Sequence, residues 1–87
     1  MNKEKILIAL NSIKDGESTG YFHDELETLT SIVLNSSNAD KEKILAELNA
    51  MQNGDNTGNY DINALITIAD SLSDEEIAEA WEDLRTE

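Results

Sequence analysis

The chain has 87 residues, enough for one hydrophobic core, so we expect a single domain over residues 1–87. It has no cysteine, which excludes disulfides, thiolate zinc sites and cysteine nucleophiles and is typical of a reducing compartment. The apolar run at residues 6–10 is shorter than the ~7–15 residues of a secretory signal core and the ~20 residues of a membrane span. We therefore expect a cytoplasmic protein that does not contact a membrane.

The net charge of −13 is distributed unevenly along the chain. Residues 1–43 carry eight carboxylates and five lysines, a net of −3, whereas residues 44–87 carry eleven carboxylates and one arginine, a net of −10. Direct binding to nucleic acid or to anionic lipid is disfavoured, because both carry the same sign as the protein. A basic protein surface is the favoured partner, and we expect the second half of the chain to contact it.

Apolar residues at helical spacing predict five helices, so the fold class is expected to be all-α. The first and third helices should end at Gly16 and Gly54, because glycine suits the left-handed position just past a helix end. Residues 62–69 also contain alternating apolar positions typical of a strand, but Ala64 and Leu65 favour a helix there. The five apolar stripes consist of Ile6, Leu7, Leu10 and Ile13; Phe22, Leu26, Leu29 and Val33; Ile44, Leu45, Leu48 and Met51; Ile62, Leu65, Ile66, Ala69 and Leu72; and Ile77, Trp81 and Leu84.

The first two predicted helices are repeated by the next two. Shifted by 38 residues, positions 2–20 align with positions 40–58 without a gap, with ten identities in nineteen positions, and the match continues more weakly after a one-residue insertion. We expect two tandem helix–loop–helix repeats, at residues 2–35 and 40–72, related by approximate pseudo-symmetry and followed by an acidic C-terminal helix at residues 74–86. The residues expected to be buried together are Ile6, Leu10, Ile44, Leu48, Leu65 and Trp81.

The loop inside each repeat has oxygen-bearing residues at the spacing of a calcium-binding loop. An EF-hand places ligands at positions 1, 3, 5, 7 and 9 and glycine at position 6. Gly20 and Gly58 occupy that sixth position, so the chain resembles a paired EF-hand domain. The candidate ligands are Asp15, Glu17, Thr19, the Tyr21 carbonyl and His23 in the first loop, and Asn53, Asp55, Thr57, the Asn59 carbonyl and Asp61 in the second.

The two loops depart from the EF-hand pattern at the position that decides affinity. The twelfth position, where the family has a bidentate glutamate, is Leu26 in one loop and Ala64 in the other. The alternative is that both loops are polar turns that use glycine for their backbone angles. We therefore expect no bound metal and no cofactor, and no calcium affinity tighter than the millimolar range.

The final helix is the stronger candidate for a binding site. Ser73 followed by Glu76 is a capping box that should start this helix. Its carboxylates recur at i, i+3 and i+4, so they should form an acidic row on the side opposite Ile77 and Trp81. The predicted partner-binding residues are Glu75, Glu76, Glu79, Glu82 and Asp83 of this row, together with Asp55, Asp61 and Asp70.

These patterns favour a binding protein over an enzyme, because the chain has a single histidine and no nucleophile motif. The first hypothesis is an inhibitor or regulator of a basic, nucleic-acid-handling protein. Phage anti-restriction and anti-CRISPR proteins and nuclease-toxin immunity proteins are analogous as a class, and some act as DNA mimics. The alternatives are a degenerate EF-hand-like, calcium-responsive module and a plain adaptor. The protein is expected to be a monomer or a homodimer.

Overall fold

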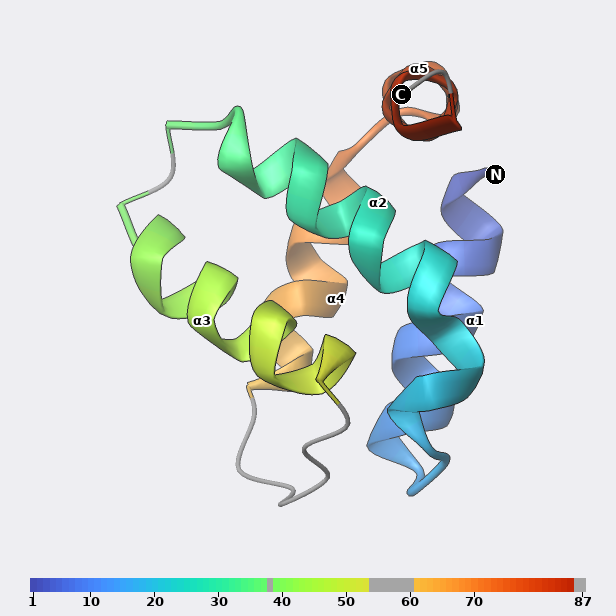
Figure 1. The fold of residues 1–87 in the computed structure, drawn as a ribbon, viewed down its shortest axis with the longest axis vertical. Helices are drawn as coiled ribbons and strands as arrows, with labels where there is room; N and C mark the ends of the chain where they lie inside the picture. The colour runs from blue at the N-terminus through green and yellow to red at the C-terminus, as the bar shows by residue number, and fades with distance from the viewer. Residues whose placement is uncertain (38, 54–60, 86–87) are drawn as a thin grey trace.

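In the computed structural model, four helices surround one aliphatic core and a fifth lies across one end of it (Figure 1). The structure describes residues 1–37, 39–53 and 61–85. These ranges contain no strand, so the all-α prediction is confirmed, and residues 62–69 form a helix. In chain order the elements are α1 (Lys3–Lys14), the 3₁₀ helix η1 (Thr19–Phe22), α2 (His23–Leu34), α3 (Lys41–Gln52), α4 (Ile62–Ser71) and α5 (Asp74–Arg85).

The ends of α1 are closed by the local chemistry of its sequence. At its start, the Asn2 side chain accepts a hydrogen bond from the Lys5 N–H at 2.9 Å. At its end, Gly16 has a φ of 106°. The Gly16 N–H donates to the Ile13 carbonyl at 3.0 Å, and the Glu17 N–H donates to the Ser12 carbonyl at 2.9 Å. This pair of bonds is a Schellman motif, which confirms the predicted role of Gly16; Gly54 lies outside the described residues.

The main contacts between the four core helices run from one predicted repeat to the other. α2 packs on α3, and α1 packs on α4. A side-chain hydrogen bond crosses each of these interfaces: Gln52 Nε2 donates to Thr30 Oγ1 at 2.8 Å, and Lys14 Nζ donates to Asn63 Oδ1 at 2.9 Å. The buried core formed in this way contains Ile6, Leu10, Leu26, Leu29, Val33, Ile44, Leu48, Met51, Leu65, Ala69 and Ile77.

The helix boundaries follow the offsets found in the sequence. α1 and α3 are both 12 residues long and begin 38 positions apart, at Lys3 and Lys41. α2 and α4 begin 39 positions apart, at His23 and Ile62, as the one-residue insertion requires. Exchanging α1 with α3 and α2 with α4 turns one of the two main interfaces into the other. The pseudo-symmetric duplication stays a prediction, and these boundaries are what it requires.

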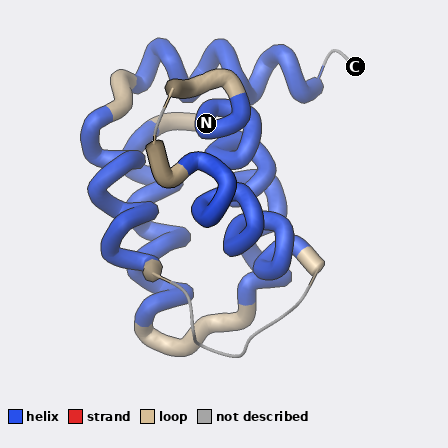
Figure 2. The backbone as a smooth tube through the Cα atoms, turned by 90° about the vertical axis from the view of Figure 1, so that its left-hand side faces the viewer, coloured by secondary structure: helices blue, strands red, loops and turns tan. Residues whose placement is uncertain are grey.

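The expected core differs from the structure at Trp81. Ile6, Leu10, Ile44, Leu48 and Leu65 are buried as predicted, but Trp81 is only half-buried. In α5, Ile77 alone is fully buried, because this helix lies across the end of the molecule rather than between other helices (Figure 2). Among the described residues, no helix combines the length and the apolar character needed to cross a membrane.

Replacing Leu48 by alanine should destabilise the protein by about 2–5 kcal/mol, because the side chain is 0% exposed and its removal leaves a cavity. Ile8→Ala is the matched control: Ile8 is 55% exposed on α1, so we expect a change within about 0.5 kcal/mol. Urea denaturation followed by circular dichroism gives both free energies of unfolding. Equal, small effects of the two substitutions would contradict the assigned core.

Candidate partner-binding surface

The start of α5 is built by the capping box that the sequence predicts. The Glu76 N–H donates to Ser73 Oγ at 3.1 Å, and Glu76 Oε1 accepts from the Ser73 N–H at 3.3 Å. Asp74, Glu75 and Glu76 lie in the first turn, where carboxylates interact favourably with the positive end of the helix dipole. Glu76 therefore stabilises the start of α5 as part of the capping box.

The remaining carboxylates of the predicted row are exposed along α5. Glu82 lies 3.8 Å from the Arg85 guanidinium, a pair in which both side chains are more than half exposed and which contributes little to stability. The side chains of Glu75 and Glu79 make no hydrogen bond or ion pair with another described residue. We call the exposed set the acidic face of α5; its members are Glu75, Glu79, Glu82 and Asp83.

The other predicted partner-binding carboxylates lie elsewhere and have structural contacts. Asp61 caps α4, since its Oδ1 accepts from the Ala64 N–H at 3.1 Å. Asp70 lies at the end of α4, with its carboxylate 3.9 Å from Lys3 Nζ and its carbonyl accepting from the same amine at 2.9 Å. Asp55 lies outside the described residues. The structure therefore groups the candidates of α5 and separates Asp61 from them.

On the side of α5 that faces the bundle, one residue is fully buried. Ile77 is 0% exposed against the core, and α2 is the helix that α5 contacts most. Trp81 and Leu84 are half-buried, and the Arg85 guanidinium lies 5.9 Å from the centroid of the Trp81 ring. At the other end of α5, Asp74 Oδ1 accepts from the Lys3 N–H at 2.9 Å. These contacts hold α5 across the bundle with its acidic face outward.

The candidate ligands of the first loop have different surroundings and do not converge on one point. Thr19, the fifth-position ligand of the EF-hand comparison, is 3% exposed and starts η1. His23 lies 3.2 Å from Glu27, one turn later on α2. Asp15 and Glu17 are exposed. In the described part of the chain, no three His, Asp or Glu side chains gather where they could hold a metal ion.

Of the candidate ligands in the second loop, the structure describes Asn53 and Asp61. Asp55, Thr57 and the Asn59 carbonyl lie outside the described residues, while Asn53 is the C-cap of α3 and Asp61 is the N-cap of α4. The absence of calcium binding stays a prediction for both loops.

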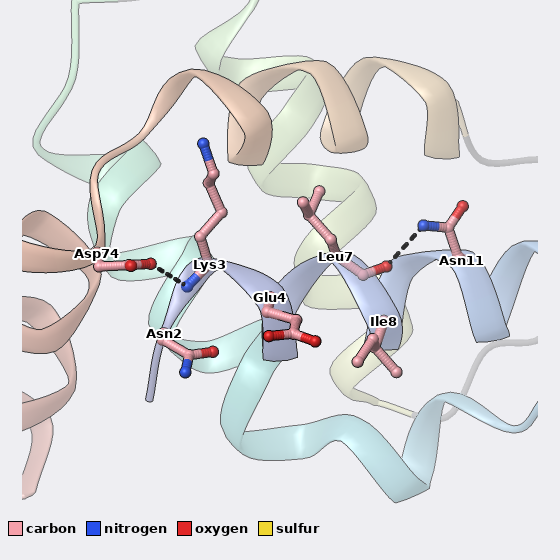
Figure 3. A pocket seen from close by; sticks show the side chains of 7 residues that line it. All are labelled: Asn2, Lys3, Glu4, Leu7, Ile8, Asn11 and Asp74. Carbon is pink, nitrogen blue, oxygen red and sulfur yellow. Dashed lines mark hydrogen bonds between the residues drawn. The ribbon is translucent and has the colours of Figure 1, made fainter.

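A groove along α1 was not predicted from the sequence (Figure 3). It has a volume of about 320 Å³ and runs along the outward side of this helix, with Asp74 of α5 at one end. The residue that could have indicated this groove in the sequence is Ile8, an apolar residue beside the buried stripe of α1. In the structure Ile8 is 55% exposed. The groove is lined by Asn2, Lys3, Glu4, Leu7, Ile8, Asn11 and Asp74.

Comparisons of the chain with models of known protein families, with curated protein sequences and with solved structures give no match.

Burial raises the pKa of Glu25, in the first turn of α2, and the neighbouring Asp24 carboxylate raises it further, while a backbone hydrogen bond and Lys5 act in the opposite direction. A carboxyl whose pKa is higher in the folded than in the unfolded state destabilises the fold when it is ionised. Glu25→Gln should therefore stabilise the protein at pH 7. The gain should disappear as the pH falls towards the ordinary glutamate pKa of about 4.3. Thermal melting across this pH range measures the effect.

Glu42→Gln is the matched control for Glu25→Gln, since Glu42 is exposed in the first turn of α3. Both substitutions remove a carboxylate from a helix N-terminus, so their difference isolates the burial of Glu25. If Glu25→Gln lowers the melting temperature at pH 7 by as much as Glu42→Gln does, the destabilising role of Glu25 is wrong.

Calorimetric titration with calcium should show no saturable heat up to the millimolar range, because both loops lack the carboxylate at position twelve. Helicity followed by circular dichroism should not change over the same titration. A dissociation constant near the micromolar range would contradict this prediction and favour the calcium-responsive alternative.

Proposed function

We propose that this protein acts by binding, and that it inhibits or regulates a basic protein that handles nucleic acid. The observation that carries the proposal is the acidic face of α5. It presents Glu75, Glu79, Glu82 and Asp83 on one helix at the end of the bundle. Between residues 44 and 84 the chain contributes ten carboxylates and no lysine or arginine. This density of one sign suits a surface of the opposite sign.

The spacing of these carboxylates supports a nucleic-acid-handling partner in particular. Residues three and four apart on a helix have Cβ atoms about 5–6 Å apart, which is comparable to phosphate spacing along a nucleic-acid strand. A rigid helix with such a row can occupy a basic groove that otherwise holds the nucleic-acid backbone. Anti-restriction, anti-CRISPR and immunity proteins are the kind of inhibitor to which this description applies, and catalysis by the protein itself is not part of the proposal.

The net charge of −13 should also speed the encounter with such a partner. Long-range attraction raises association rates by about 10–10³-fold, and screening by salt removes most of that gain. Exposed carboxylates serve this purpose at little cost to folding, because each contributes little to the stability of the fold. The proposal therefore predicts binding whose rate depends strongly on ionic strength.

The test is to reverse charge on the acidic face of α5 and at a control site. Glu79→Lys combined with Glu82→Lys changes the net charge from −13 to −9. Asp15→Lys combined with Glu17→Lys makes the same change in the loop after α1, which lies at the end of the molecule opposite α5 (Figure 1). Immobilised wild type and both variants are exposed to lysate of the cell that makes the protein, and the retained proteins are identified by mass spectrometry.

We expect the wild type and the loop variant to retain the same basic proteins and the α5 variant to lose them. With an isolated partner, the α5 variant should associate about tenfold or more slowly at low salt, and the difference should shrink at high salt. The melting temperatures should barely differ, because exposed substitutions change stability by about 0.5 kcal/mol or less. Equal association rates of both variants at both salt levels would mean that the carboxylates serve solubility alone.

A further inference from the structure

The groove on α1 is a surface with a different character from the acidic face of α5. Glu4, Leu7, Ile8 and Asn11 lie at i, i+3, i+4 and i+7, so they form one stripe along the helix (Figure 3). Ile8, in the middle of this stripe, is 55% exposed, while Leu7 packs partly against the core. The groove therefore has an apolar centre, and both residues of that centre come from a helix that is firmly packed on α4.

The groove is net acidic, because it has two carboxylates, Glu4 and Asp74, and one cation, Lys3, which is paired with Asp70 outside the groove. Lys3 Nζ donates to the Asp70 carbonyl at 2.9 Å and lies 3.9 Å from the Asp70 carboxylate. Glu4 is exposed beside Ile8. Asp74 Oδ1 accepts from the backbone N–H of Lys3 at 2.9 Å. Both carboxylates therefore lie on the N-terminal side of the apolar centre, towards α5, and Asn11 follows it on the other side (Figure 3).

A second copy of the chain is a poor occupant for this groove. It would bring another net charge of −13 against Glu4 and Asp74, and the cation of its own groove would be engaged in the same way. A complementary occupant has apolar residues that cover Leu7 and Ile8 and has cations that face the two carboxylates. An amphipathic helix with lysine or arginine beside its apolar stripe has this arrangement, and docking of such a helix in a groove is a recurring mode of recognition.

We propose that the groove on α1 binds a basic amphipathic helix of the partner protein. This inference rests on the proposed function for the basic character of the partner, and adds a second contact site with an apolar centre. Asp74, the first residue of α5, joins the groove to that helix. A partner bound in both places would contact α1 through apolar packing and α5 through charge.

The experiment uses two synthetic helical peptides as probes. The first carries leucine at i, i+3, i+4 and i+7 and lysine elsewhere; the second has the same composition with the leucines spread around the helix. Their affinities are measured by fluorescence anisotropy, and the contacted residues are mapped by NMR on the isotope-labelled full chain. Ile8→Gln removes the exposed apolar side chain of the centre without changing charge. Leu34→Gln is the matched control, because Leu34 is 56% exposed as the last residue of α2.

We expect the amphipathic peptide to shift amide signals of residues 2–11 and of Asp74, and Ile8→Gln to weaken its binding about tenfold. Leu34→Gln should leave the affinity unchanged, and circular dichroism should show that both variants are folded. If both peptides bind equally and Ile8→Gln has no effect, the groove is not a docking site. Binding that shifts α5 signals and weakens with salt would then leave the proposed function standing.

Two further outcomes would also overturn the inference. If neither peptide binds the wild type at low salt, the groove does not take a basic helix, and the acidic face of α5 loses support at the same time. If sedimentation shows a dimer that Ile8→Gln dissociates, the occupant of the groove is a second copy of the chain.

Discussion

The apolar stripes of α1 and α2 are covered chiefly by helices of the other predicted repeat, so neither helix pair buries its own apolar residues fully. Leu10 of α1 and Leu65 of α4 belong to the same buried cluster as Leu26 of α2 and Leu48 of α3. A chain of 87 residues has enough apolar material for one such cluster. We therefore expect the two helix pairs to unfold in one cooperative transition. Among the described residues, α5 enters this cluster through Ile77 alone.

The packing of each repeat on the other also determines which charged side chains are paired and which are exposed. All five lysines are in the first 43 residues, and two of those on α1 reach across to the second half of the chain. Lys14 donates to Asn63 on α4, and Lys3 binds Asp70 at the end of the same helix. Two of the three lysines of α1 are thus used where the halves meet, Lys3 beside the start of α5 and Lys14 at the other end of α1. On α5 itself, Arg85 is the one cation beside the outward carboxylates. The uneven distribution of charge along the sequence therefore gives an uneven distribution of charge on the surface.

Helical spacing and local motifs were sufficient to predict the five α-helices and most of the core, but not the 3₁₀ helix η1. Gly16 and the Ser73–Glu76 box depend on interactions within a few residues, so they can be read from the sequence. Trp81 shows the limit, because periodicity indicates which side of a helix faces inward but not how deeply the helix is embedded. The contacts of Lys3 with Asp70 and Asp74 join residues 67 and 71 positions apart. Such contacts depend on the packing of whole helices, and so does the groove beside them.

The acidic face of α5 is not explained by the stability of the helix itself. Asp74, Glu75 and Glu76 lie at the positive end of the dipole, where carboxylates stabilise a helix, and Glu76 also completes the cap. Glu82 and Asp83 lie in the last turns, where a negative charge is unfavourable, and Glu79 adds like-charge repulsion at i+3 and i+4. The exposed ion pair of Glu82 with Arg85 offsets only part of this cost. Lysine at positions 79 and 82 would be more favourable for the helix dipole and would remove this repulsion. The part of the acidic face that helix stability disfavours is therefore the part on which the proposed contact with a basic partner depends.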